Sequence, residues 1–138
     1  MDGLKDPRLW LWLAGAIQAG IVLANLPLPA RLRVREGIAP LPRFLRQVFI
    51  VHWIYIVLTV ALFSALCFIF PRELAGASPL GRFLSGFLAF FWGLRIVLQL
   101  LYYDAGVRRQ HRVLDICYLV GLCALAGILV AAASGALV

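Results

Sequence analysis

Four runs of about twenty predominantly apolar residues divide the chain, and they constrain its fold more than any other feature of the sequence. A helix needs about twenty such residues to cross the roughly 30 Å hydrocarbon core of a bilayer. Backbone groups in lipid must be hydrogen-bonded within the protein, which favours helices for segments of this length. The sequence therefore predicts an all-α integral membrane protein whose helices span the membrane at 9–26, 48–69, 83–103 and 114–137.

Composition supports the same class of protein. Of the 138 residues, 64% are hydrophobic and 14% are charged, whereas a soluble domain of this length keeps many more charged side chains at its surface. Asp2 and Asp6 make a poor basic start for a signal peptide, so the first run is expected to be a true span. The short connections predict a single transmembrane domain over residues 1–138, built as a four-helix up-down bundle.

The formal net charge of +7 could suggest a nucleic-acid partner, but the positions of the basic residues indicate membrane orientation instead. Eight arginines lie in the connections between the first and second and between the third and fourth spans, against four basic residues on the other side. Positively charged loops tend to stay in the cytoplasm, which predicts that both termini lie outside. A protein-docking patch is the alternative for the first basic segment. The arginines expected to contact anionic headgroups are Arg31, Arg33, Arg35, Arg108 and Arg109.

The sequence carries no motif that predicts catalysis or metal binding. There are no paired carboxylates, nucleophile elbow, phosphate-binding loop or cluster of metal ligands. The three cysteines form no CxxC pair and are expected to be small packing residues. A haem b would need two axial histidines on facing helices, and the candidates are His52 and His111, of which the second lies in a connection. Haem b is therefore not expected, whereas a bound lipid or quinone stays open, and a role without catalysis is favoured.

Arg95 stands in the middle of the third run, where a charged side chain costs about 2.5–3.5 kcal/mol. Snorkelling is disfavoured, because helical side chains lean toward their own N-terminus, which for this span is the farther interface. Asp104 lies about 13 Å farther along the same helix, and Asp115 lies at the inner end of the fourth span. Neither acid is expected to reach Arg95 easily. The open alternatives are a neutral cage, a carboxylate of a partner subunit and an anionic ligand headgroup.

Polar residues on three of the predicted helices are expected to form one seam that opens toward the cytoplasm. Gln18, Tyr55 and Arg95 lie at similar distances from the inner ends of their spans. At 100° per residue, Gln99 and Tyr102 fall within about 40° of Arg95. The residues predicted to hold a ligand or a partner are Arg95, Gln99, Tyr102, His52, Tyr55, Gln18 and Trp92.

Two segments, RQVFIVHWIYIVL and GFLAFFWGLRIVLQLLYYDA, resemble a group of short uncharacterised bacterial membrane proteins. That group carries an FWG-x-R element followed by a glutamine and an aromatic-Asp end. The matching residues here are Phe91, Trp92, Gly93, Arg95, Gln99, Tyr103 and Asp104. The resemblance covers about half of the chain. It implies a four-helix architecture, and with it a bacterial inner membrane, but no particular activity.

Two functions of different classes fit these observations. The first is a small non-enzymatic subunit that binds and stabilises a larger membrane complex, with the plain fourth helix facing lipid or the partner. The alternative is a membrane-embedded binder or enzyme for an amphipathic lipid, quinone or isoprenoid, whose head Arg95 would hold. The expected partners are membrane lipids and either a larger membrane protein or a second copy of the chain. A channel or transporter is less favoured, because no residue marks a site for a coupling ion.

Overall fold

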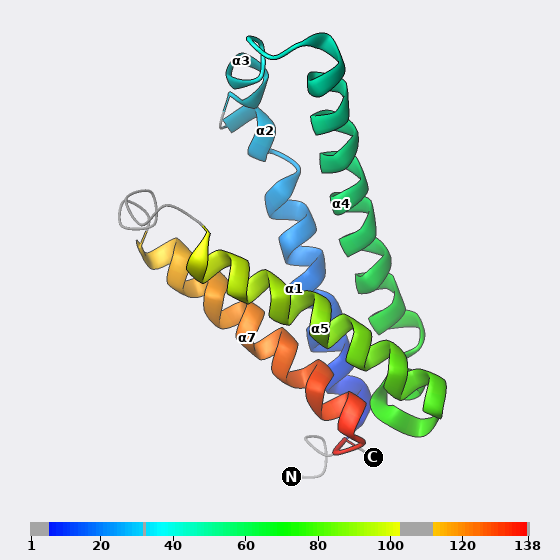
Figure 1. The fold of residues 1–138 in the computed structure, drawn as a ribbon. Coiled ribbons are helices and arrows are strands. Elements are labelled where there is room, and N and C mark those ends of the chain that lie inside the picture. Colours follow the sequence, from blue (N-terminus) through cyan, green and yellow to red (C-terminus); the bar gives the residue numbers. More distant parts are fainter. Residues whose placement is uncertain (1–5, 32, 103–111, 138) are drawn as a thin grey trace.

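The computed structural model describes residues 6–31, 33–102 and 112–137, and every regular element in this part of the chain is a helix (Figure 1). Four helices are long and apolar enough to cross a membrane. The predicted all-α class and the four spans are therefore confirmed, although α4 begins at Arg43 and not at 48. The four helices are α1 (Pro7–Asn25), α4 (Arg43–Ile69), α5 (Pro79–Leu101) and α7 (Arg112–Ser134).

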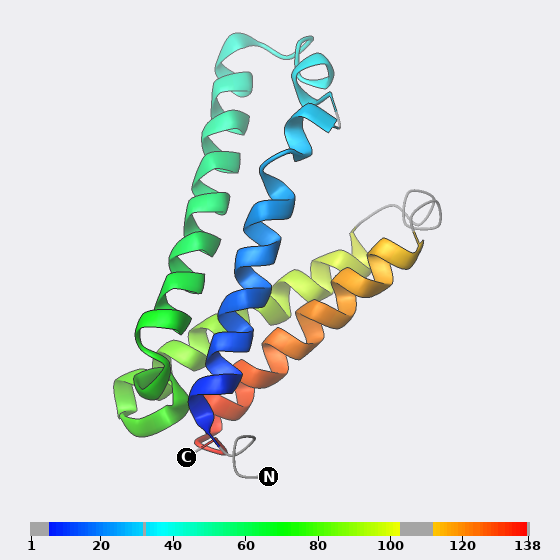
Figure 2. The ribbon, with the colours of Figure 1, turned by 180° about the vertical axis from the view of Figure 1, so that it is seen from behind.

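The four helices form two antiparallel hairpins, α1 with α4 and α5 with α7 (Figures 1 and 2). The hairpins meet at the end where α1 begins and α7 finishes, here called the terminal end. They diverge toward the opposite end, here called the basic end, which holds the arginine-rich connection between α1 and α4. That connection contains two short helices, α2 (Leu28–Arg31) and α3 (Val34–Gly37). The bundle is therefore V-shaped, with α1 the member of its hairpin that packs on α7.

Local sequence signals fix where α1 and α5 begin. The carboxylate of Asp6 accepts a 2.9 Å hydrogen bond from the backbone N–H of Arg8. The hydroxyl of Ser78 accepts a 3.0 Å hydrogen bond from the backbone N–H of Gly81. A proline lies in the first turn of both helices. Side-chain caps satisfy N–H groups that have no partner inside the helix, and proline has no N–H to satisfy.

The apolar core lies where the hairpins meet, and a glycine allows the close contact within the first hairpin. A Cβ atom built on Gly15 would lie 3.0 Å from the ring of Phe68 and 3.2 Å from the Cβ of Cys67. The hydroxyl of Ser64 donates a 2.8 Å hydrogen bond to the carbonyl oxygen of Gly15. Small residues let helix backbones approach where lipid offers no hydrophobic driving force. Core side chains from all four helices include Leu11, Ala14, Val60, Cys67, Leu88, Trp92, Leu122, Leu125 and Leu129.

The turn between α4 and α5 packs against the end of α7. It forms a short π-helix, η2 (Glu73–Ala77), in which Leu74 is buried. Ser85 of α5 donates a 2.6 Å hydrogen bond to the carbonyl oxygen of Leu74. Gly76 has a φ of 99°, and a Cβ atom there would lie 2.8 Å from the carbonyl oxygen of Ala132. Only glycine fits both this backbone conformation and this approach.

Arg82 joins α5 to the last turn of α7. Its Nε donates to the carbonyl oxygen of Ala133 at 3.2 Å, and its Nη2 donates to that of Ser134 at 2.7 Å. The last carbonyls of a helix lack partners within the helix and carry a negative partial charge. The guanidinium therefore caps α7 from a neighbouring helix.

The fourth span packs more closely than the sequence suggested. In the most apolar 18 residues of each span, 28% are buried in α7 and in α5, against 11% in α4. The fourth helix is therefore not the most exposed of the four spans, and α4 is. The sequence suggested exposure because α7 carries few polar side chains. Its burial depends instead on its close pairing with α5 along their length.

Candidate functional site

A chain of hydrogen bonds runs from Arg95 to an acid on the neighbouring helix. Nη1 of Arg95 donates to Oε1 of Gln99 at 3.0 Å, one turn farther along α5. Nε2 of Gln99 donates to Oδ1 of Asp115 at 2.7 Å, in the first turn of α7. The amide oxygen of Gln99 thus accepts from a cation, and its amide nitrogen donates to an anion. A cation and an anion within one hydrogen-bonded network cost far less in the membrane than either charge alone.

This network corrects the expectation that Asp115 lies too far away to serve Arg95. The expectation considered only direct contact between Arg95 and an acid. It took no account of Gln99, whose side chain connects the two. Because α5 and α7 are antiparallel neighbours, the last turn of one lies beside the first turn of the other. Asp115 is also stabilised where it lies, since the N-terminus of a helix carries positive partial charge.

Tyr118 links this network to the space between the two hairpins. The Cζ atom of Arg95 lies 5.6 Å from the centre of the Tyr118 ring, a cation–π distance. Tyr118 also lines a groove of about 200 Å³ between α1 and α7. Tyr118 therefore contacts the guanidinium of Arg95 and also forms part of the wall of the groove.

Small and apolar residues form the rest of the α1–α7 groove. Gly20 is exposed, and a Cβ atom built on it would have no neighbour within 4 Å. Gly121 faces it from α7, and a Cβ atom built on Gly121 would lie 4.0 Å from the side chain of Ile17. Ala16 and Ala24 lie one turn to either side of Gly20, and both are exposed. The complete lining is Ile17, Gly20, Ile21, Ala24, Cys117, Tyr118 and Gly121.

Gln18 and Trp92 form a separate, closed contact in the core. The side chain of Gln18 is fully buried. Its Oε1 accepts a 3.3 Å hydrogen bond from Nε1 of Trp92. Its Nε2 donates to the carbonyl oxygen of Ala14 at 3.1 Å and to Sγ of Cys67 at 3.3 Å. Because these partners lie on α1, α4 and α5, Gln18 fastens three helices together and does not belong to the Arg95 network.

His52 and Tyr55 lie away from both clusters, on the exposed surface of α4. The contact between Ser64 and Gly15 fixes the register of α4 against α1. Counted from that contact at 1.5 Å per residue, Tyr55 lies about 9 Å closer to the basic end than Gln18 does. The single polar seam expected from three helices is therefore not formed. The depth count failed because it set the inner ends of the spans level, whereas α4 extends toward the basic end beyond the end of α1.

The polar groups on this face of α4 are partly satisfied by their own helix. Nδ1 of His52 lies 2.8 Å from the carbonyl oxygen of Val48. The hydroxyl of Thr59 donates to the carbonyl oxygen of Tyr55 at 2.8 Å. The indole N–H of Trp53 is buried, and it has no hydrogen-bond partner among the residues that the structure describes.

The remaining predicted site residues lie at the basic end or outside the described residues. Tyr102 follows the last residue of α5 and is exposed. Arg31, Arg33 and Arg35 are exposed, and Arg33 lies 3.8 Å from the carboxylate of Glu36. Their contact with anionic lipid stays a prediction. The predicted residues that lie outside the described part of the chain are Tyr103, Asp104, Arg108, Arg109 and His111.

The cysteines divide into one buried and two exposed side chains. Cys67 is buried, as expected of a packing residue, whereas Cys117 and Cys123 are exposed on α7. Within the ranges 6–31, 33–102 and 112–137, no group of three histidine, cysteine or acidic side chains is placed to hold a metal ion.

No family model, curated protein or solved structure matches this chain. Its class therefore rests on the four apolar helices and their packing. This is an integral membrane protein. The features that distinguish it are the Arg95–Gln99–Asp115 network and the groove that Tyr118 shares with α1.

Proposed function

We propose that this protein is a small non-enzymatic membrane subunit that receives a transmembrane helix of a larger membrane complex in its α1–α7 groove. The observation that carries the proposal is the exposed pair of Gly20 and Ala24 on α1, which lines the groove together with Gly121 of α7. The groove lies between α1 and α7, two helices through which the hairpins contact each other, and the hairpins diverge toward the basic end (Figure 2).

Helix association in lipid supports this choice of surface. Transmembrane helices associate by close packing, so their contacts are enriched in small residues at every fourth position. Gly20 has no neighbour within 4 Å of its built Cβ, so its backbone is open to a partner that approaches closely. In contrast, the large side chains that cover α4, such as Phe44 and Ile56, are suited to contact with lipid.

The polar network has a supporting role in this proposal. Arg95 and Gln99 fix the first turn of α7 against α5, and the guanidinium holds the ring of Tyr118 at the wall of the groove. A partner helix would then meet a wall that is already ordered, which lowers the entropy lost on association.

Native mass spectrometry of the tagged protein, extracted in a mild detergent, tests the proposal with Gly20→Leu. The leucine fills the groove and should abolish recovery of the larger subunits. Gly127→Leu is the matched control, because Gly127 is also a helical, exposed glycine with no neighbour within 4 Å of its built Cβ. Both substitutions favour helix by about 0.8–1 kcal/mol. Recovery of the wild type alone, or equal recovery with both variants, would show that the proposal is wrong.

A second function is favoured by the position of Tyr118. This residue lies both in the groove and under the guanidinium of Arg95, so an apolar space adjoins a polar network. An amphipathic lipid, quinone or isoprenoid could place its tail along the groove and its head near Arg95. The same spectra distinguish this function: the purified chain would carry one reproducible extra mass of lipid or quinone size. Gly20→Leu and Arg95→Lys should both remove that mass.

A further inference from the structure

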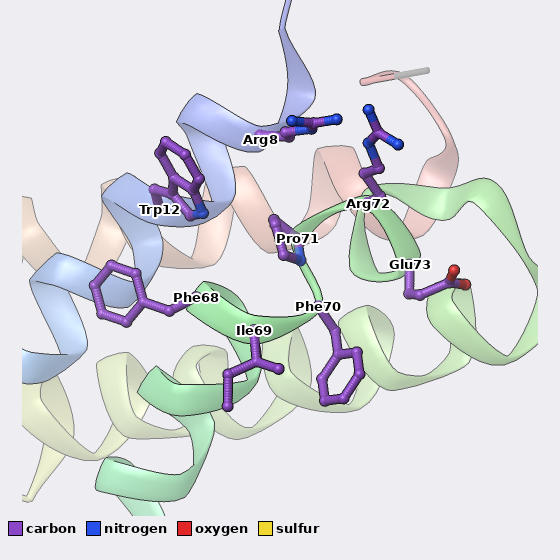
Figure 3. A pocket seen from close by; sticks show the side chains of 8 residues that line it. All are labelled: Arg8, Trp12, Phe68, Ile69, Phe70, Pro71, Arg72 and Glu73. Carbon is purple, nitrogen blue, oxygen red and sulfur yellow. The ribbon is translucent and has the colours of Figure 1, made fainter.

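A second groove, of about 430 Å³, lies at the terminal end (Figure 3), and it shares no lining residue with the groove between α1 and α7. Its residues come from the first turns of α1, the end of α4 and the beginning of the turn that follows. Its volume falls within the range of about 300–1,000 Å³ that is usual for ligand sites.

Two arginines from different elements form the polar part of this groove. Arg8 lies in the first turn of α1, and Arg72 follows the end of α4. Figure 3 shows both guanidinium groups on the same side of Pro71, with the carboxylate of Glu73 pointing away from them. Among the residues that the structure describes, no hydrogen bond or ion pair occupies either guanidinium. The carboxylate of Asp6 is engaged by the backbone N–H of Arg8.

The rest of the groove is apolar and aromatic. In Figure 3, Trp12 and Phe68 lie to the left of Pro71, and the two guanidinium groups lie above it. Trp12 is 44% exposed, Phe68 45% and Ile69 66%, so a large apolar surface stays open to an occupant. An anion and an apolar chain would thus find their complements within one groove.

The groove lies at the depth where a lipid changes from head to tail. α4 ends at Ile69, and charged residues follow within four positions. The end of an apolar span marks the boundary of the hydrocarbon core, and tryptophan is enriched at that boundary. The guanidinium groups therefore lie at headgroup level, with the aromatic surface beside the acyl chains.

We propose that this groove binds one anionic phospholipid, with the headgroup phosphate between Arg8 and Arg72 and an acyl chain along Phe68 and Ile69. Guanidinium groups match phosphate oxygens in geometry and can donate two hydrogen bonds to one group. The two arginines outnumber the one acid that lines the groove, so its local charge favours an anion. The site is separate from the α1–α7 groove, which lies farther along α1.

Lipid titration of the delipidated full chain, followed by native mass spectrometry, tests this site. The probes are phosphatidylglycerol and phosphatidylcholine with identical acyl chains, so that only the headgroup charge differs. The wild type should retain one phosphatidylglycerol in preference to phosphatidylcholine. The double variant Arg8→Gln, Arg72→Gln should weaken that preference by about fivefold for each arginine, the ratio that corresponds to about 1 kcal/mol.

Matched variants separate the site from general charge and from loss of folding. Arg43→Gln with Arg46→Gln removes the same charge from the opposite end of α4 and should keep the preference. Arg8→Lys with Arg72→Lys keeps the charge, so it should retain a reduced preference. An equal loss with the Arg43 and Arg46 variant, or no preference in the wild type, would overturn the proposal. Competition by inorganic phosphate at the same concentration as the lipid would overturn the assignment to a lipid.

Discussion

Gln99 donates a 2.7 Å hydrogen bond to Asp115, and through this contact the third membrane-spanning helix holds the fourth. The same amide accepts from Arg95 at 3.0 Å, so one neutral side chain connects a cation to an anion inside the bundle. Gln99 is 8% exposed, which keeps water from replacing either bond. The network explains how a helix of membrane-spanning length accommodates an arginine near its middle.

Replacement of Gln99 by leucine should destabilise the protein. The variant loses both hydrogen bonds of the bridge, and buried polar groups that lose partners cost about 1–3 kcal/mol. The midpoint of thermal unfolding in detergent measures the effect. Gln47→Leu is the control, because Gln47 is exposed at the start of α4. Equal midpoints for the two variants would mean that the bridge does not contribute to stability.

Two glycines of α1 should respond in opposite ways to the same substitution. Gly15→Leu should destabilise the hairpin by about 1–3 kcal/mol, because a Cβ atom there already lies 3.0 Å from Phe68. Gly20→Leu should leave stability unchanged or raise it, since its Cβ would have no neighbour within 4 Å. Thermal unfolding of both variants in the same detergent compares them. The register of α1 against α4 would need revision if Gly15→Leu were the more stable of the two.

Loss of the Arg82 guanidinium should loosen the end of α7. Arg82→Gln removes the hydrogen bonds to the carbonyls of Ala133 and Ser134, each charge-assisted. An interaction of this kind at an exposed helix end contributes about 0.3–1 kcal/mol. Hydrogen exchange should therefore be faster at the amides of Gly135 and Ala136 and unchanged in the middle of α7. Unchanged exchange at those two amides would rule out the cap.

The three cysteines should differ in their reaction with N-ethylmaleimide. Cys117 lies near the start of α7 and should be labelled in the purified protein, whereas Cys67 is buried and Cys123 lies in the middle of an apolar span, so both should be labelled only after unfolding. Peptide mass spectrometry locates the label. In the intact complex, a partner helix in the groove should protect Cys117, which lines it. Labelling of Cys117 at the same rate with and without the larger subunits would count against the proposed groove.

The spans could be predicted from the sequence because lipid leaves few alternatives for an apolar segment of this length. The bilayer favours a helix and sets its length, whereas the caps Asp6 and Ser78 start α1 and α5 two and four residues before the predicted spans. The contacts between helices could not be predicted in the same way. Whether Asp115 lies near Arg95 depends on how α5 and α7 are paired and on the side chain that lies between them. Neither the pairing of two helices nor the side chain that bridges them produces a periodic pattern in a single sequence.

The candidate site was predicted in part, and the misplaced residues of α4 show one reason for the errors. Arg95 and Gln99 were expected to act together, and they do lie in contact. Tyr55 and His52 were assigned to the same seam by setting the inner ends of the spans level, but α4 extends beyond the end of α1 toward the basic end. A few residues of error at a helix end move a side chain by several ångströms along the axis. The groove was not predicted, because small residues four positions apart are common in any alanine-rich span and do not identify a site.

The divergence of the two hairpins gives the molecule unequal cross-sections in the two leaflets of a membrane (Figures 1 and 2). A body shaped as a wedge displaces more lipid area on one side of the bilayer than on the other. Its energy in a membrane therefore depends on curvature, and strongly curved regions that match the wedge are favoured over flat ones. Occupation of the wide side by another helix would even out the two areas and remove that dependence.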